Sequence, residues 1–198
     1  ATASGTYVGD YFYNSDSGAT AFGAGINQEV YDADSLSATA TNSGDIGVLA
    51  SATVDFVAGT YTSAAAFGAG VSQELGYGES AVASFVNSGS LSVTASAKNT
   101  FDYTGIAAAY SVAGGVSQNI YEVENGTLDF ENAADGSMTV QANATANALY
   151  GIADATALGA SQSIDDTGDD STADITATNL GTMSVASLAT ANSTYVAS

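Results

Sequence analysis

The chain has 198 residues, of which 21 are acidic and only one is basic, so its formal net charge is −20. Histidine, cysteine, proline and tryptophan are absent, while 45% of the residues are hydrophobic. Nucleic acids and anionic membranes are bound through Lys and Arg, which excludes both as partners. No apolar run is long enough for a spanning helix, so we expect no membrane insertion. Without imidazole, thiolate or a Gly-Lys phosphate loop, we expect no enzyme.

A repeat of about 45 residues organises the whole sequence. The string Gly25-Ile26-Asn27-Gln28 returns as Gly70-Val71-Ser72-Gln73 and Gly115-Val116-Ser117-Gln118, with a degenerate fourth copy, Gly159-Ala160-Ser161-Gln162. An asparagine followed by a glycine turn comes after each copy, at Asn42, Asn87, Asn132 and Asn179. Repeats of this length are typical of architectures built by stacking one unit on the next.

Taken in chain order, the first repeat predicts three strands. The first strand leads into the glutamine with Phe22, Ala24 and Ile26 on one face, and the second covers residues 36–40. The third follows the glycine turn over residues 46–52, with Ile46 and Val48 on one face. A period of two indicates strands with one buried side, and it recurs in the later repeats.

We therefore expect one all-β domain over residues 1–198, with a partial repeat at 1–17 and repeats at 18–62, 63–107, 108–152 and 153–198. Small inward residues, mostly Ala, favour a narrow β-solenoid (β-helix) whose coils stack on one another. Three strands per repeat predict two coils per repeat, with one large coil as an alternative. A β-propeller-like fold or a β-sandwich is the competing architecture. One apolar residue after each turn should stack in order: Ile46, Leu91, Met138 and Met183.

The recurring amides are expected to be structural. Gln28 shares its parity with Phe22, Ile26 and Val30, so it should point inward and satisfy its amide there. The same reasoning applies to Gln73, Gln118 and Gln162. An asparagine next to a glycine turn can form a hydrogen-bonded ladder along a stack, which we expect for Asn42, Asn87, Asn132 and Asn179.

The acidic residues concentrate between each glutamine and the following asparagine. Stacking would align them in a stripe, which is either a solvated face or a calcium site, because a divalent cation relieves repulsion between carboxylates. The densest candidate metal cluster is Asp165, Asp166, Asp169 and Asp170.

The Gly-[Ile/Val]-x-Gln and Asn-x-Gly-x-[Ile/Leu]-x-Val motifs resemble the β-solenoid repeats of large bacterial surface proteins, namely autotransporter passengers and adhesins. The resemblance covers residues 18–198 and implies an extracellular, cell-surface, structural or adhesive role. Residues 1–8 are nearly repeated by residues 189–196, and both ends read like repeat interior without edge-blocking residues. We therefore expect a subunit or segment of a filament that assembles with itself, head to tail. The alternative function is a surface module that binds calcium or surface glycans through the acidic stripe.

Overall fold

The structure is a computed structural model that describes residues 2–9, 17–56, 61–101, 105–165 and 172–193, and the side chains of 18–55, 61–100, 105–165 and 172–193. Within these residues the chain is all-β. The eleven strands are β1 (Thr2–Gly9), β2 (Ser17–Tyr31), β3 (Ser35–Asn42), β4 (Asp45–Phe56), β5 (Tyr61–Asn87), β6 (Ser90–Phe101), β7 (Ile106–Asn132), β8 (Ser137–Ala148), β9 (Tyr150–Asp165), β10 (Thr172–Asn179) and β11 (Thr182–Ser193).

The strands form two sheets in which every described pairing is parallel. Sheet A has the order β1-β4-β6-β8-β11. Sheet B has the order β10-β7-β5-β2, with β3 also paired to β5 and β9 to β7. Propeller blades and sandwiches are built from antiparallel pairs, so the structure does not support those alternatives.

Each repeat supplies one rung, by which we mean the strand segments that one repeat adds to the two sheets. The register joins equivalent residues of successive repeats, as in Gln28 with Gln73 and Ile46 with Leu91. No described strand pairs with another strand of its own rung. The expectation of two coils per repeat is therefore wrong. Alternation within a repeat shows which face is buried but not which strand lies alongside, so the sequence pattern left this open.

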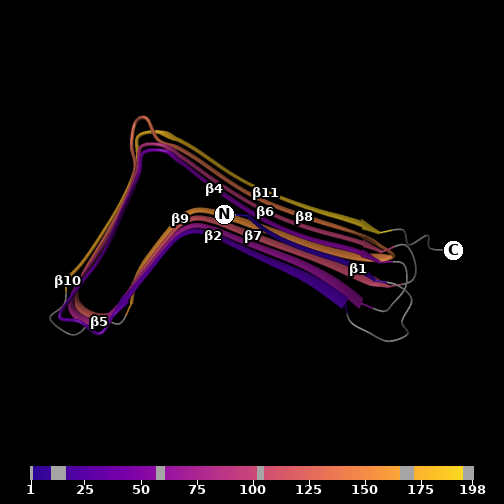
Figure 1. The fold of residues 1–198 in the computed structure, drawn as a ribbon, viewed down its shortest axis with the longest axis horizontal. Coiled ribbons are helices and arrows are strands. Elements are labelled where there is room, and N and C mark those ends of the chain that lie inside the picture. Colours follow the sequence, from indigo (N-terminus) through magenta and orange to yellow (C-terminus); the bar gives the residue numbers. More distant parts are fainter. Residues whose placement is uncertain (1, 10–16, 57–60, 102–104, 166–171, 194–198) are drawn as a thin grey trace.

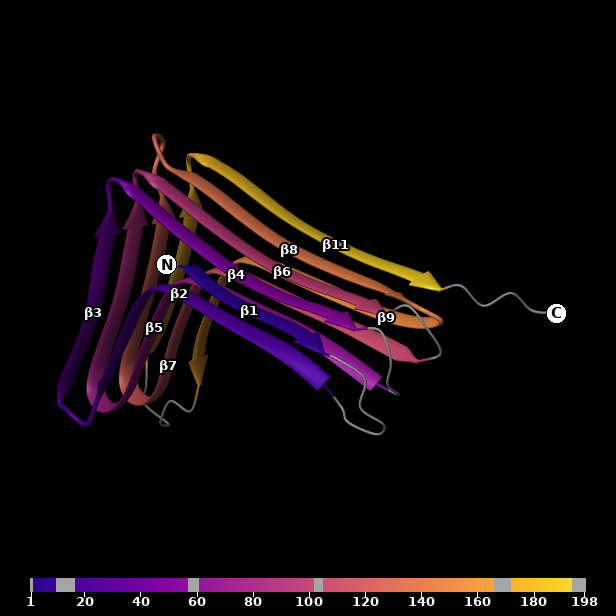
Figure 2. The ribbon, with the colours of Figure 1, turned by 45° about the vertical axis from the view of Figure 1, so that its right-hand side comes forward.

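The rungs stack into a body with two parts (Figure 1; Figure 2). We call the part formed by the first halves of β2, β5, β7 and β9 under sheet A the tail, and the part formed by their second halves with β3 and β10 the lobe. In the tail, β4, β6, β8 and β11 of sheet A lie over the first halves of the long strands of sheet B. The facing side chains there are mainly alanines, such as Ala95 and Ala97 against Ala64 and Ala66, all buried. Small side chains allow the two layers to approach closely.

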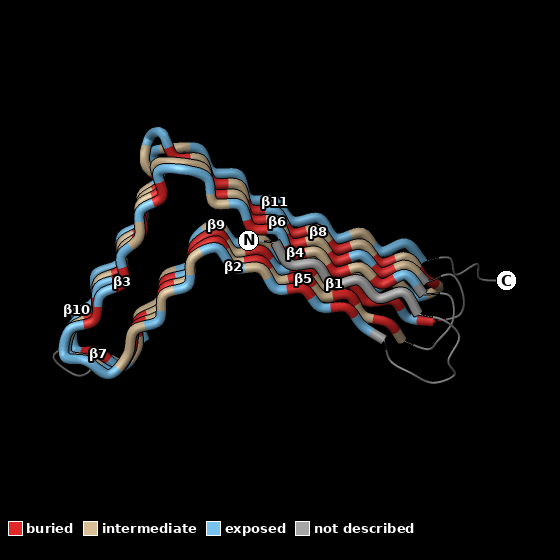
Figure 3. Tube along the Cα trace, viewed as in Figure 1, coloured by how far each residue is buried: buried red, intermediate tan, exposed pale blue. Residues whose placement is uncertain are grey.

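In the lobe the chain opens into a triangular outline that large side chains fill. Phe85 and Phe130 stack there with ring centroids 6.3 Å apart, and Leu75, Ile120 and Leu128 are fully buried nearby. Buried and exposed residues alternate along the strands of both parts, as the period of two predicts (Figure 3). The inward row of Ile46, Leu91, Met138 and Met183 is also confirmed, because consecutive members pair in sheet A.

The inward parity of each long strand changes at one glycine. In β5 the even-numbered residues are buried up to Gly70, and the odd-numbered residues Val71, Gln73 and Leu75 are buried after it. A Cβ atom on Gly70 would lie 2.5 Å from the carbonyl oxygen of Gly115 and 2.9 Å from Cδ1 of Leu91. The backbones are thus too close for any side chain at this kink.

The parity change corrects one expectation from the sequence. Gly25 occupies the same kink position in β2, so Phe22 and Gln28 do not share a face. Phe22 is 69% exposed and stacks on Phe67 outside the tail, with ring centroids 4.9 Å apart. The assumption of an unbroken strand was wrong here, whereas the inward direction of the glutamines was right.

Candidate assembly interface

The four glutamines form a hydrogen-bonded ladder inside the lobe. Nε2 of Gln73 donates to Oε1 of Gln28, Nε2 of Gln118 to Oε1 of Gln73, and Nε2 of Gln162 to Oε1 of Gln118, each at 2.7 Å. Each Nε2 also donates to a carbonyl on the neighbouring segment of its own rung, at 3.0–3.1 Å. These carbonyls determine which amide atom is nitrogen, because they can only accept.

The four asparagines form a second ladder at the turn that leads into sheet A. Nδ2 of Asn42 donates to Oδ1 of Asn87 at 2.8 Å, Asn87 donates to Asn132 at 2.8 Å, and Asn132 donates to Asn179 at 2.7 Å. Each of these donors also bonds a carbonyl of the next rung, on Ser90, Ser137 and Thr182. Both predicted ladders are therefore present, and Gln73, Gln118, Asn87 and Asn132 are at most 1% exposed.

The two ladders run in opposite directions. The glutamines donate toward the N-terminal rung and the asparagines donate toward the C-terminal rung. Among the described residues, Gln162 Oε1 accepts no hydrogen bond and Asn179 Nδ2 donates none, so the C-terminal end offers one acceptor and one donor. At the N-terminal end, one N–H of Gln28 has no partner among the described residues, and Asn42 Oδ1 accepts only from the amide of Gly44.

A buried polar pair in the tail was missed at the sequence level. Thr62 Oγ1 donates a hydrogen bond to Asn99 Oδ1 at 3.0 Å, and Asn99 Nδ2 donates to the carbonyl of Ala108. Both side chains are fully buried. Asn99 has the parity of Val93 and Ala97, so the alternation of β6 would have identified it as inward.

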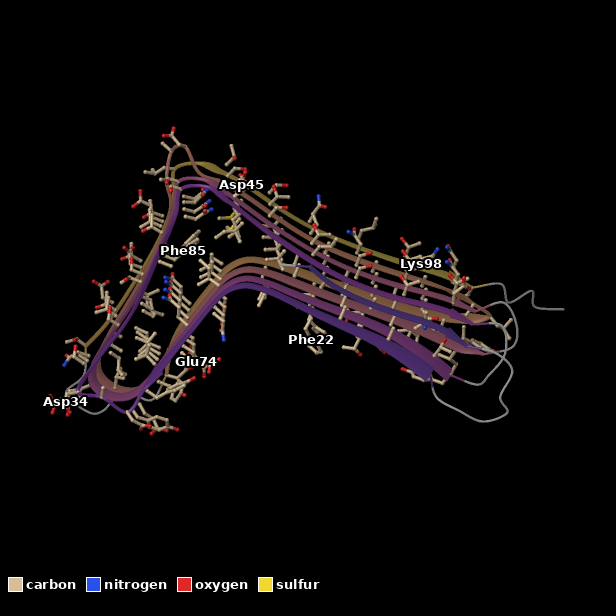
Figure 4. The ribbon with its side chains drawn as sticks, viewed as in Figure 1. Phe22, Asp34, Asp45, Glu74, Phe85 and Lys98 are labelled. Carbon is tan, nitrogen blue, oxygen red and sulfur yellow. The ribbon has the colours of Figure 1, made fainter. Side chains whose placement is uncertain are left out.

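Several acidic residues lie near the bend of the lobe around residues 32, 77 and 122, where Asp34 and Glu74 project outward, whereas Asp45 lies at the turn that leads into sheet A (Figure 4). Glu29 pairs in register with Glu74, but the next two rungs have Asn119 and Ser163 in this row, so the expected stripe is interrupted. The bend residues Asp32, Tyr77 and Glu122 have left-handed backbones, with φ of 59°, 64° and 52°. The carboxylate of Glu122 raises the pKa of the neighbouring Tyr77 hydroxyl.

The candidate calcium cluster is not assembled in the part of the chain that the structure describes. Asp165 is exposed and accepts a hydrogen bond from Ser163 Oγ at 2.7 Å, whereas Asp166, Asp169 and Asp170 lie outside the described residues. Among the described residues, no three Asp or Glu side chains are close enough to hold one metal ion. Nor does the described part of the chain include a helix with the length and apolarity to cross a membrane.

Hydrogen-bonding groups therefore remain available at both ends of the described stack. The interior amides are hydrogen-bonded to one another. The remaining donors and acceptors, on Gln28, Asn42, Gln162 and Asn179, lie on the first and last rungs. Comparison with known proteins gives no family: no protein-family model, no curated protein and no solved structure matches the chain.

Proposed function

We propose that the chain is a β-solenoid structural protein, a subunit or segment of an extracellular cell-surface filament or adhesin, and that its copies stack head to tail. The extracellular setting and an adhesive role are supported by the resemblance to the repeats of bacterial surface proteins. The stacking is supported by the chemistry of the two ends. A head-to-tail contact of this kind does not close on itself and produces a filament.

The single observation behind the proposal is the complementarity of the ladder ends. In a head-to-tail joint, the spare N–H of Gln28 meets Oε1 of Gln162, and Nδ2 of Asn179 meets Oδ1 of Asn42. Both ladders then continue across the joint with the polarity that they have inside the chain. A joint between two identical ends that kept each ladder in line would bring donor to donor and acceptor to acceptor. The ladders therefore favour one orientation and one register.

Apolar side chains at the two ends supply the attraction. Met183 and Val185 on the last described rung face inward yet are 36% and 42% exposed, because no other described rung covers them. Ile26 and Ile46 are half-buried at the other end. Stacking buries these side chains and pairs the open strand edges, and each buried methylene contributes about 0.8 kcal/mol.

β1 places a condition on the joint. It pairs with residues 49–56 of β4, which is the register that residues 186–193 of an incoming copy would occupy. A continuous joint therefore requires β1 to release that edge of sheet A. We expect this exchange to make assembly slow to start.

Engineered cysteines test the polarity, since the chain has none of its own. Thr39, Ser84, Asp129 and Thr176 form one outward row, so Thr176 of one copy would lie beside Thr39 of the next. Adjacent strands are about 4.8 Å apart, which suits a disulfide. Under mild oxidation, a mixture of the T39C and T176C proteins should give a mixed disulfide dimer, and each protein alone should not dimerise. Equal dimer formation by either protein alone, or none in the mixture at high concentration, would overturn the proposal.

A further inference from the structure

The two outer faces of the tail differ in chemistry. On the sheet B side, which we call the tail face, the outward side chains are mainly apolar, and Phe22, Phe67, Ile106, Val112, Ile152 and Leu158 belong to it. Five of these six are at least 36% exposed, and Phe67 is half-buried. Figure 4 shows Phe22 projecting from this side and Lys98 from the other. Monomeric proteins rarely expose a continuous apolar surface of this kind without a partner.

The opposite face carries mainly hydroxyl, amide and charged groups, with Leu49 and Leu188 as its exposed large apolar side chains among the described residues. The outward residues of β6 and β8 include Thr94, Ser96 and Lys98, followed by Gln141 and Asn143. In contrast, the only charged side chain that the structure describes on the tail face is Asp154. A chain with a net charge of −20 repels its own copies over most of its surface, and this repulsion is weakest at the tail face.

The orientation of the aromatic rings indicates what can pack here. The rings of Phe22 and Phe67 are nearly parallel, 12° apart, and are stacked along the direction in which the rungs repeat. They therefore point their edges away from the sheet and do not offer the open ring faces on which a sugar stacks. Ring edges and short apolar side chains fit between the side chains of another flat sheet, as in sheets packed about 10 Å apart.

The area is sufficient for a contact between two copies. Residues 61–69 extend about 26 Å along the strand, and four rungs extend about 19 Å across it, which gives about 500 Å² per copy. Two such faces bury about 1,000 Å², the lower limit for a specific interface. We propose that the tail face binds the tail face of a second copy, so that two chains, or two stacks of chains, associate side by side.

The test uses a chain in which stacking is blocked, so that the lateral contact is measured separately from the head-to-tail joint. Ile175 faces inward on the last rung and is 50% exposed, so Ile175→Glu would place a carboxylate inside any stacked joint. In this background, F67D/V112D introduces two carboxylates into one row of the tail face. T94D/Q141D is the matched control, with the same charge change in one row of the same two rungs on the opposite face.

Sedimentation equilibrium is measured over micromolar to millimolar concentrations, with circular dichroism to verify folding. We expect a reversible dimer in the background chain, a loss of at least about 100-fold in association for F67D/V112D, and less than about 3-fold for the control. F67S/V112S, which adds no charge, should weaken the dimer in the same direction. A monomer throughout, or equal losses in both double variants, would overturn the proposal. A monomer that bound insoluble polysaccharide or lipid vesicles through this face would overturn it too and assign the face to that occupant.

Discussion

Replacing Gln73 tests whether the glutamine ladder stabilises the lobe. Its side chain donates to Gln28 Oε1 and to the carbonyls of Ala38 and Ser84, and it accepts from Gln118. Gln73→Leu removes these bonds and leaves buried partners unpaired, which we expect to cost about 2–4 kcal/mol of unfolding free energy. Gln73→Glu should cost several kcal/mol more at pH 7, because a buried carboxylate would face carbonyl oxygens and could donate nothing to them.

The pH dependence separates the two substitutions further. Burial raises the pKa of the introduced carboxyl above its unfolded value of about 4.3. The folded state then binds its proton more tightly, so the stability of Gln73→Glu is fully present in acid and is lost as the pH rises through the raised pKa. Urea unfolding followed by circular dichroism at pH 4 and pH 7 measures this. Gln141→Leu and Gln141→Glu, at an exposed position on the outer face of sheet A, are the controls and should change little. Equal stability of the two Gln73 variants at pH 7 would refute a buried ladder.

Three further predictions concern the kink, the lobe core and the bend. Gly70→Ala should lose several kcal/mol of unfolding free energy because its Cβ has no space, whereas Gly47→Ala, which meets no atom within 4 Å, should be nearly neutral by the same urea titration. Phe85→Ala should cost about 3–5 kcal/mol by leaving a cavity in the lobe, and Phe22→Ala, at an exposed position, should cost far less in thermal unfolding. For Tyr77, whose pKa is raised, stability should be complete below the unfolded value of about pH 10 and fall above it, and Tyr77→Phe should reduce that fall in an alkaline unfolding series.

The local pattern predicted much of the fold. Alternation in residues 90–97 identified a strand with Leu91 and Val93 inward, and the repeat placed Gln73 and Asn87 beside their counterparts 45 residues away. These predictions held because the register of stacked repeats follows from identical residues at identical positions.

What could not be predicted depends on three-dimensional packing. Nothing in a period of two shows that Gly25 interrupts it, and the interruption moves Phe22 from the interior to the tail face. The number of coils per repeat depends on which strands lie alongside each other, and the alternation within a repeat does not determine that. The direction of each ladder depends on which carbonyl lies near each amide, and this is visible only in the structure.

Helical reconstruction of the assembled protein by electron microscopy tests head-to-tail stacking most directly. We expect strands perpendicular to the filament axis with a spacing of about 4.8 Å, and a rise of about 19 Å for each four-rung copy. All copies should point in one direction, with the lobe continuous along one side. A chain that stays a monomer at every concentration, strands that run along the axis, or neighbouring copies that point in opposite directions would contradict head-to-tail stacking.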